Sequence, residues 1–418
     1  MSDKIKLCIF DEFKENKAYG IKTYINQLIE CLLDSEYELI VVNLCTSGEK
    51  VCDCFEGKLR QIFIPYTPGF LQSMKTFRYY LRNTAFILKE LLGETSTRYI
   101  FHLNYMSSYW LVVYLKKLFE CQVVLTIHYK NWNIDLKGDE RRLITILKKP
   151  ISELNKFESS IINELNRDYQ IISHCDYIIC VANHTLNTYN RLNSKLTKNM
   201  SVIHNAIKDE YRPVSIPEKA RIRKRFGLPV NATLFIYAGR LEELKGIAQL
   251  IEAFKLHLEE THSNSHLALV GSGDLEKFKR MTYPWQAHIS FLDWRDKDSM
   301  YQLYSTADIG IISSLYEEFG FTAIEMMMHR LPIISSDTGG LSEIIMDGIT
   351  GYTVPLIYEI DRAPHLDIIA LKEKINHLST TTNLIEQMRN KSRQIFLQKF
   401  EITSFRDKLS KIYNNLSY

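Results

Sequence analysis

Residues 4–44, KIKLCIFDEFKENKAYGIKTYINQLIECLLDSEYELIVVNL, place an amphipathic helical pattern between two short apolar runs. The runs KIKLCIF and YELIVVNL have the length and composition of buried strands, whereas GIKTYINQLIECLL repeats its apolar residues at helical spacing. A strand, a helix and a second strand in this order are typical of a parallel sheet that is covered by helices. The stretch therefore predicts an α/β fold.

The same rhythm continues along the chain and restarts once. Further strand-like runs are RYIFHLN, CQVVLTIH and DYIICVA, and after the polar stretch 205–230 come TLFIYAG, HLALVG, HISFL, DIGIISS and LPIISS. One hydrophobic core seldom exceeds roughly 250–300 residues, so a chain of 418 residues should form two domains. We predict two Rossmann-like domains with doubly wound parallel sheets, over residues 1–205 and 206–396. Two such domains that face each other leave a cleft between them. Ligands of open α/β sheets bind beyond the carboxyl ends of the strands, so the binding site should lie in this cleft.

The composition is that of an ordinary globular protein and disfavours several functional classes. The 52 basic and 49 acidic side chains leave a net charge of +3, too small a surplus for a nucleic-acid partner. No apolar run reaches the ~18 residues of a membrane span, and the N-terminus lacks a signal-peptide pattern. The eight cysteines fit a reducing compartment, so we expect a cytoplasmic protein.

Two motifs that suggest a cofactor have simpler explanations. GSGDLE, at 271–276, lacks the third glycine of a dinucleotide fingerprint, so a nicotinamide or flavin is not expected. Asp296 and Asp298 precede a helical pattern, where an aspartate more often caps free backbone amides than binds a metal. We therefore expect neither a cofactor nor a metal ion.

The most informative stretch is SSLYEEFGFTAIEMMMHRLPIISSDTGGLSEII, residues 313–345, in which seven residues separate Glu317 from Glu325. Glu317 lies in a loop before a predicted helix, and Glu325 lies one turn into that helix, where it could accept hydrogen bonds from a ribose. Gly320 lets a ligand approach the backbone, and the free amides that open the helix suit a phosphate. By itself, so short a pattern equally fits a surface loop and a helix with solvated glutamates.

A second stretch, FIYAGRLEELKG, ends an apolar strand with two cations. Arg240 follows the strand, and Lys245 precedes the helix IAQLIEAF. A guanidinium fork, an ammonium group and the helix dipole together form a clamp for a diphosphate. The alternative is a pair of ordinary surface cations that pair with Glu242 and Glu243.

Further motifs follow in the second half of the chain, in the order LVGSGD, FLDW, TGGLSEII and GITGYTVP. Together with GRLEELKG and the two glutamates, they make the second domain similar to retaining glycosyltransferases of the GT-B fold, in particular glycosyltransferase family 4. In the first domain the resemblance rests on Gly20, on TIHYKNW around His128 and on VIHNAI at 202–207. The resemblance implies transfer of a sugar from a nucleotide diphosphate donor to an acceptor, with retention of configuration.

The resemblance also implies a role for each matching residue of the second domain. Arg240 and Lys245 would hold the donor diphosphate and stabilise the charge that develops on it. Glu325 would bind the ribose hydroxyls, and Glu317 would face the transferred sugar.

Backbone amides near Gly320, Phe321 and Thr322 would meet the sugar and the phosphates. From the first domain, Gly20 would let the backbone close on the diphosphate, and His128 would reach the donor sugar.

The first domain departs from the family pattern at two places. Tyr129 stands where an aspartate usually follows His128, which leaves the details of sugar contact open. A lone histidine at the end of an apolar strand is as often a core or edge residue. Asn205 and Ala206 replace the common asparagine and glycine pair, and that segment is interpreted as a linker.

The acceptor is left open between a glycan, a lipid carrier and a peptide. The family places the C-terminal helix, within residues 397–418, back against the first domain. Two other functions share this architecture, namely a nucleotide-sugar epimerase or phosphorylase and a non-catalytic nucleotide-sugar binding protein. The presence of Glu317, Arg240 and Lys245 favours the transferase.

A basic stretch suggests a further partner. Between residues 58 and 89 the chain has no acidic residue, and its apolar residues, among them Leu71, recur at near-helical spacing. Its six basic residues are Lys58, Arg60, Lys75, Arg78, Arg82 and Lys89. This pattern fits a peripheral contact of residues 58–92 with an anionic membrane at its inner face. It also fits a core-packed helix with solvated cations, which is the commoner case.

Overall fold

The computed structural model describes residues 5–12, 19–66, 73–93, 98–359 and 363–416. Contacts between Cα atoms divide the chain into two compact units. The first unit comprises 1–132, 146–206 and 402–418, and the second comprises 133–145 and 207–401. Each unit contains its own sheet, wholly or mainly parallel. The short segment 133–145 belongs to the second unit, although both its neighbours in the chain belong to the first.

The first unit contains an eight-stranded sheet with the order β3-β4-β2-β1-β5-β6-β7-β8. Its strands are β1 (Lys6–Glu12), β2 (Glu38–Thr46), β3 (Cys52–Glu56), β4 (Leu59–Pro65), β5 (Tyr99–Leu103), β6 (Cys121–Ile127), β7 (Tyr177–Cys180) and β8 (Met200–Val202). All neighbours are parallel except β3 and β4, which form an antiparallel hairpin at one edge. Every residue of β3 is exposed, so this strand needs no apolar run and the sequence pattern did not predict it.

The helices of the first unit are α1 (Tyr19–Leu32), α2 (Met74–Leu92), α3 (Tyr109–Leu118), α6 (Lys156–His174), α7 (Asn183–Leu192) and α16 (Ile402–Leu416), together with parts of α4 (Asn131–Asp135) and α5 (Glu140–Leu147). The C-terminal helix α16 packs beside α1. Its Tyr413 hydroxyl hydrogen-bonds to Nδ1 of the buried His102 at 2.6 Å, and Tyr37 donates to Asn414 at 2.5 Å. These bonds tie the end of the chain to the sheet.

The second unit contains a six-stranded parallel sheet with the order β11-β10-β9-β12-β13-β14. Its strands are β9 (Thr233–Ala238), β10 (Ser265–Val270), β11 (Ile289–Leu292), β12 (Ile309–Ile312), β13 (Ile333–Ser336) and β14 (Gly351–Val354), beside the short pair β15 (Leu356–Ile357) and β16 (His365–Leu366). The chain first moves from β9 to one edge and then returns to β12, so β9 and β12 are neighbours at the point where the strand order reverses.

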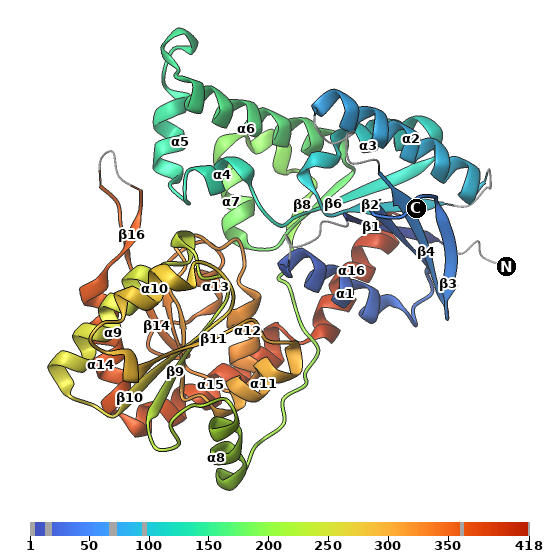
Figure 1. The fold of residues 1–418 in the computed structure, drawn as a ribbon. Coiled ribbons are helices and arrows are strands. Elements are labelled where there is room, and N and C mark those ends of the chain that lie inside the picture. Colours follow the sequence, from blue (N-terminus) through green and yellow to red (C-terminus); the bar gives the residue numbers. More distant parts are fainter. Residues whose placement is uncertain (1–4, 13–18, 67–72, 94–97, 360–362, 417–418) are drawn as a thin grey trace. The chain divides into compact units, whose positions relative to one another are not determined.

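Helices cover both faces of this sheet. They are α8 (Ile216–Arg225), α9 (Ile247–Thr261), α10 (Leu275–Met281), α11 (Lys297–Thr306), α12 (Phe321–Met328), α13 (Leu341–Ile344), α14 (Ile368–Thr380) and α15 (Thr382–Lys399). In Figure 1, α9, α10 and α14 lie on one side and α11, α12 and α15 on the other. This follows from right-handed crossovers, because connections that run in opposite directions along the sheet place their helices on opposite faces.

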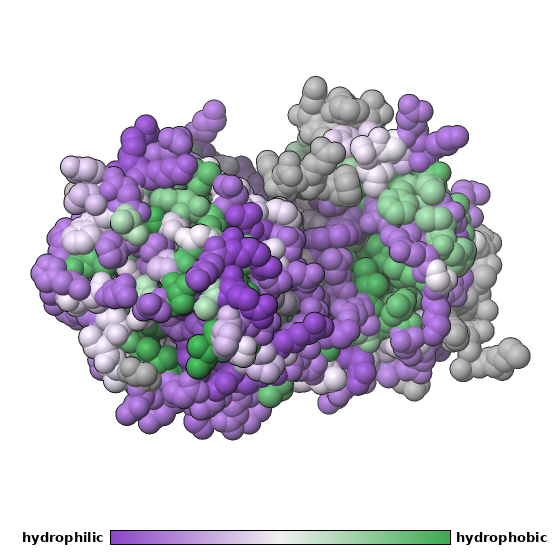
Figure 2. Space-filling model, turned by 60° about the horizontal axis from the view of Figure 1, so that its bottom comes forward, coloured by the Kyte–Doolittle hydropathy of each residue, from purple (hydrophilic) through white to green (hydrophobic). Residues whose placement is uncertain are grey.

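Apolar side chains fill the interior of both units. The strands Leu7–Phe10 and Leu234–Tyr237 are almost completely buried, as expected for parallel strands that are covered on both faces. On the face drawn in Figure 2, hydrophilic side chains predominate and hydrophobic ones gather in a few groups. Within the described ranges, no helix is long and apolar enough to cross a membrane.

Candidate functional site

The candidate site lies at the carboxyl ends of β9 and β12, at the reversal of strand order where ligands bind in open α/β sheets. A pocket of about 50 Å³ opens there. It is lined by Tyr237, Ala238 and Gly239 from the end of β9, by Lys245, and by Ile312, Ser314, Glu317, Gly320 and Thr322 from β12 and the loop that leads into α12. The two motifs that the sequence singled out, 235–246 and 313–345, therefore meet in one place.

Lys245 and Glu317 form the central contact of this pocket. The Lys245 amino group donates a hydrogen bond to Oε1 of Glu317, and their side chains are 17% and 23% exposed. Ser314 donates to the same carboxylate oxygen at 3.1 Å. Glu317 thus compensates the charge of Lys245, and an incoming diphosphate would compete with this carboxylate for the ammonium group.

Gly246 allows Lys245 to take this position. Its φ is +64°, and a Cβ atom there would lie 2.0 Å from the carbonyl oxygen of Ser313. Ser313 in turn donates through its hydroxyl to the carbonyl of Lys245 at 2.7 Å. The loop after β9 therefore packs directly on the loop after β12, and only a residue without a side chain fits at the contact.

Arg240 has a different environment from Lys245. It follows β9 but does not line the pocket, and its side chain is 64% exposed and pairs with Glu242 at 3.0 Å. One of the two surface pairings that the sequence left open is thus observed for Arg240, whereas Lys245 pairs with Glu317 and not with Glu243. An exposed guanidinium can still turn toward a ligand at low cost, because its present ion pair is largely solvated.

The start of α12 lies beside the Lys245–Glu317 pair. Gly320 precedes the helix with φ +109°, and no side chain in the described part of the chain caps the first turn. A Cβ atom at Gly320 would lie 2.8 Å from the Leu341 side chain, so the glycine keeps α12 close to α13. The backbone amides of Phe321 and Thr322, at the positive end of the helix dipole, are therefore suited to an anion.

Glu325 lies on α12, outside the lining of this pocket, and is half-buried against α11. Tyr304, which is 1% exposed, donates a hydrogen bond to Oε2 of Glu325 at 3.3 Å. Burial raises the pKa of Glu325 to about 7, although the hydrogen bond from Tyr304 opposes the shift. A carboxyl group in this state changes its charge near neutral pH.

The remaining predicted residues, Gly20 and His128, belong to the first unit. Gly20 is exposed in the first turn of α1. His128 follows β6, and its Nε2 lies 3.2 Å from Oδ1 of Asn104 while its ring packs edge-on against Tyr24. Burial, and then the charge of His102, lower the pKa of His128 to about 3, so this histidine is neutral at pH 7. The action of both residues on a donor stays a prediction.

The structure explains the acidic pair that precedes α11. Asp296 caps this helix by accepting a hydrogen bond from the Ser299 amide at 2.9 Å, as the sequence predicted. Across the described part of the chain, no group of three or more His, Cys, Asp or Glu side chains is placed to hold a metal ion.

The sequence did not identify Ser314, Tyr304 or the segment 133–145 as parts of the site. In that segment Gly138 packs on Tyr316, the residue before Glu317, and Arg141 lies over the Tyr358 ring at 4.4 Å. A serine, a tyrosine and a short insertion have no distinctive pattern, because their roles depend on contacts between distant parts of the chain.

Comparison with known proteins shows which families and structures this chain resembles. Residues 218–395, which contain the whole candidate site of the second unit except segment 133–145, match the family model described as "Glycosyl transferases group 1". Over 160 residues the chain is 32% identical to an uncharacterized glycosyltransferase of Methanocaldococcus jannaschii, covering 37% of this chain and 40% of that protein. Over 142 residues it is 32% identical to the lipopolysaccharide 1,2-N-acetylglucosaminetransferase of Salmonella typhimurium, covering 31% and 37%. The matches thus span well under half the length of these relatives.

Solved structures match over almost the whole chain. The sucrose-phosphate synthase of Thermosynechococcus elongatus superimposes with a TM-score of 0.76 at 19% identity and covers 99% of both chains. HepE of Anabaena, solved in complex with UDP, has a TM-score of 0.70 at 14% identity and covers 99% of this chain and 100% of that one. At such identities the likeness concerns the fold alone. The protein has the GT-B fold, with two Rossmann-like units, which confirms the fold class predicted from the sequence.

Proposed function

We propose that the protein is a retaining glycosyltransferase of family 4 type, which transfers a sugar from a nucleotide diphosphate sugar to an acceptor hydroxyl. The observation that carries the proposal is the Lys245–Glu317 pair beside the uncapped start of α12. This corner offers an ammonium group and free amides to a diphosphate, and a carboxylate to sugar hydroxyls. The similarity of residues 218–395 to group 1 glycosyl transferases supports it.

A nucleotide diphosphate sugar is the donor that these groups fit. Lys245, together with Arg240 when its guanidinium turns inward, would bind the diphosphate, and Glu325 would accept hydrogen bonds from the ribose hydroxyls. The structural neighbour from Anabaena was solved with UDP and with UDP-glucose, which supports a donor of this class.

The proposed transfer breaks the bond between the sugar C1 and the diphosphate oxygen and forms a bond from C1 to the acceptor oxygen. The acceptor proton passes to the departing diphosphate on the same face of the sugar, so the configuration is retained. Lys245 and the α12 amides would stabilise the charge that builds on the diphosphate. The scheme assigns the stabilisation of the leaving diphosphate to Lys245, Arg240 and the α12 amides, and uses no metal ion.

The test is a panel of UDP, GDP, ADP, CMP and their sugar conjugates in thermal-shift and calorimetric titrations. One nucleoside diphosphate should stabilise the wild type and fail to stabilise the Arg240→Ala, Lys245→Ala double variant. A labelled sugar conjugate of that nucleotide should then transfer its label only when an acceptor is present, with the anomeric configuration read by NMR. Isomerisation of the sugar without an acceptor would identify an epimerase instead, and binding without turnover would identify a non-catalytic binding protein.

We further propose that the protein contacts an anionic membrane surface through α2, where a lipid-linked acceptor would be presented. The outer face of α2 carries Lys75, Arg78 and Arg82 beside the exposed side chains of Met74 and Phe86, which are 55% and 52% exposed. A helix with cations and exposed apolar residues on one face fits the headgroup region of a bilayer.

The part of the basic stretch outside α2 offers less support for membrane contact than the sequence suggested. Lys58 and Arg60 do not lie on α2, and they pair with Asp34 and Asp53 at 2.7 Å. Leu71, which the helical spacing included, lies outside the described residues. The membrane proposal therefore rests on α2 alone.

A further inference from the structure

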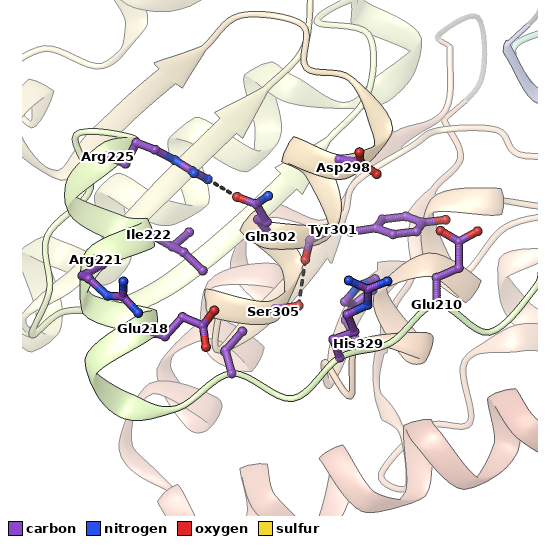
Figure 3. Close-up of a pocket in the computed structure, with 12 residues that line it drawn as sticks. Glu210, Glu218, Arg221, Ile222, Arg225, Asp298, Tyr301, Gln302, Ser305 and His329 are labelled. Carbon is purple, nitrogen blue, oxygen red and sulfur yellow. Dashed lines mark hydrogen bonds between the residues drawn. The ribbon is translucent and has the colours of Figure 1, made fainter.

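The second unit contains a much larger cavity than the candidate donor pocket, and the two share no lining residue. Its volume is about 580 Å³, within the ~300–1,000 Å³ range of small-molecule sites. It is bounded by the linker 207–215, by α8 and by the outer face of α11 (Figure 3). Glu218 and Arg221 of α8 lie on one side of the cavity, and Glu210 and His329 lie on the other.

The lining is highly charged but balanced. Three arginines (212, 221 and 225) and three acidic residues (210, 218 and 298) contribute to it. Burial lowers the pKa of His329 to about 4, so this histidine adds no charge at neutral pH. The cavity therefore has no net charge, which disfavours both a simple anion and a simple cation as its ligand.

The charges that face the cavity are not paired with one another. Arg225 donates to Gln302, and Glu210 accepts from Lys297 at 2.6 Å. For Arg212, Arg221 and Glu218, the described part of the chain provides no ion pair. The two walls thus present unpaired donors and an unpaired acceptor to the same space.

The wall formed by α11 adds uncharged groups to the lining, namely an aromatic ring, an amide and a hydroxyl. Tyr301, Gln302 and Ser305 lie on the face of α11 that points into the cavity (Figure 3). The Tyr301 ring packs between His329, at a centroid distance of 4.8 Å, and the Lys297 ammonium group at 5.4 Å. An aromatic ring with amide and hydroxyl neighbours offers both apolar and polar contacts to a ligand.

We propose that this cavity binds a neutral, hydroxyl-rich ligand, namely one sugar unit of an oligosaccharide, between Arg212 of the linker and Glu218 of α8. Each hydroxyl of a sugar can donate to a carboxylate and accept from a guanidinium at the same time, so one ring joins charges that do not reach each other. The choice of a sugar among neutral polyols rests on the proposed glycosyl transfer. The site would hold a glycan away from the donor pocket.

Ligand binding in the cavity can be measured by NMR on the full-length protein. The methyl resonances of Ile222 and Val214 report on it, because both side chains line the cavity. Maltotriose, cellotriose, α-linked mannotriose and N-acetylated chitotriose serve as neutral probes, inorganic phosphate serves as an anionic probe, and glycine serves as a zwitterionic one. At least one neutral trisaccharide should shift these resonances, with a dissociation constant on the order of 1 mM, about −4 kcal/mol. Arg212→Gln and Glu218→Gln should each weaken this binding at least tenfold.

The matched control is Lys224→Gln, on the exposed side of α8 and outside the lining, which should bind the same sugar as the wild type does. The proposal is overturned if no neutral probe shifts Ile222 or Val214, if only phosphate or glycine does, or if both lining variants bind normally. Nucleotide titrations report separately on methyl groups of Ile312 and Thr322 in the donor pocket. Nucleotide binding without sugar binding refutes the cavity site alone, and the reverse result refutes the proposed transferase alone.

Discussion

The Tyr304 hydroxyl donates a hydrogen bond to Oε2 of Glu325 across 3.3 Å, and so connects α11 to the carboxyl group proposed to bind the donor ribose. Tyr304 is 1% exposed, so its ring is shielded from a ligand and its hydroxyl acts by orienting Glu325. The buried Tyr304 ring shields the α11 side of Glu325 from water. On that side the Tyr304 hydroxyl is the hydrogen-bond donor that holds the carboxyl group in place.

Replacing Tyr304 by phenylalanine should therefore weaken donor binding while the fold is kept. A hydrogen bond to a charged group contributes about 1.5–3 kcal/mol, so calorimetry should find a nucleotide affinity that is lower by about tenfold or more. Tyr283→Phe, at a side chain that is 72% exposed, is the matched control and should bind normally. Equal affinities for Tyr304→Phe and the wild type would show that Glu325 is positioned by other contacts.

The Lys245–Glu317 pair predicts a thermodynamic coupling. Lys245→Gln should abolish nucleotide binding and lower the free energy of unfolding by about 1–3 kcal/mol, because Ser314 is then the one donor among the described residues that still reaches the Glu317 carboxylate. Adding Glu317→Gln should recover most of this stability but not the binding. Urea unfolding and calorimetry of the single and double variants measure both effects.

Lys277→Gln serves as the control for the loss of a lysine charge, since Lys277 pairs with Glu243 on the exposed surface at 2.7 Å. It should change neither quantity by more than about 0.5 kcal/mol. Nucleotide binding by Lys245→Gln at wild-type affinity would remove the central support of the proposed function.

Gly246→Ala should be strongly destabilising, because a methyl group there would lie 2.0 Å from the Ser313 carbonyl oxygen and force the two loops of the site apart. We expect a loss of about 3 kcal/mol or more together with impaired nucleotide binding. Gly348→Ala separates the steric clash from backbone strain, since Gly348 also has a positive φ, +72°, but no atom of the described residues lies within 4 Å of its Cβ position. It should lose only about 1 kcal/mol, from backbone strain. Similar melting temperatures for both variants would contradict the close approach.

Glu325 predicts a pH dependence of donor binding. Its pKa is raised to about 7 by burial, and ribose hydroxyls donate more strongly to the ionised carboxylate. The affinity for a nucleotide sugar, whose diphosphate does not titrate near neutrality, should rise with pH by up to about tenfold per unit below pH 7 and level off above it. Glu325→Gln should bind more weakly and show a flat profile. A parallel slope in the variant would assign the titration to another group.

The raised pKa of Glu325 also makes the free energy of unfolding depend on pH, and this free energy should fall with rising pH whereas the donor affinity should rise. A carboxyl group whose folded pKa exceeds its unfolded value favours folding at low pH, and this contribution is lost as the pH rises through the folded value. The ligand-free wild type should therefore lose stability between pH 5 and 7 relative to Glu325→Gln, as measured by urea unfolding.

Membrane contact through α2 predicts cosedimentation with anionic vesicles at low salt. Each surface cation contributes about 1 kcal/mol, so Lys75→Gln combined with Arg82→Gln should weaken binding about 30-fold. Lys195→Gln with Lys198→Gln removes the same charge from exposed positions elsewhere in the first unit and should have little effect. Equal losses in both double variants would indicate attraction by net charge, and absence of binding by the wild type would refute the proposal.

Several parts of the fold could be read from local sequence. The strands that contain KIKLCIF, YELIVVNL, TLFIYAG and DIGIISS were recognisable because strands buried on both faces are continuously apolar. The hairpin partner β3 was not recognised, because an exposed edge strand such as CDCFE needs no apolar residues. Domain limits from the sequence, at 205/206 and 396/397, lie near the contact boundaries at 206/207 and 401/402.

What the sequence by itself determined is the α/β rhythm and the identity of the charged residues at the strand ends, since both depend on neighbours in the chain. Only the tertiary structure decided that Lys245 pairs with Glu317 while Arg240 faces solvent, and that Tyr304 holds Glu325. It also placed segment 133–145 in the second unit. The physical reason is that partners 21 to 72 residues apart are brought together by strand order and loop packing, which no local pattern encodes.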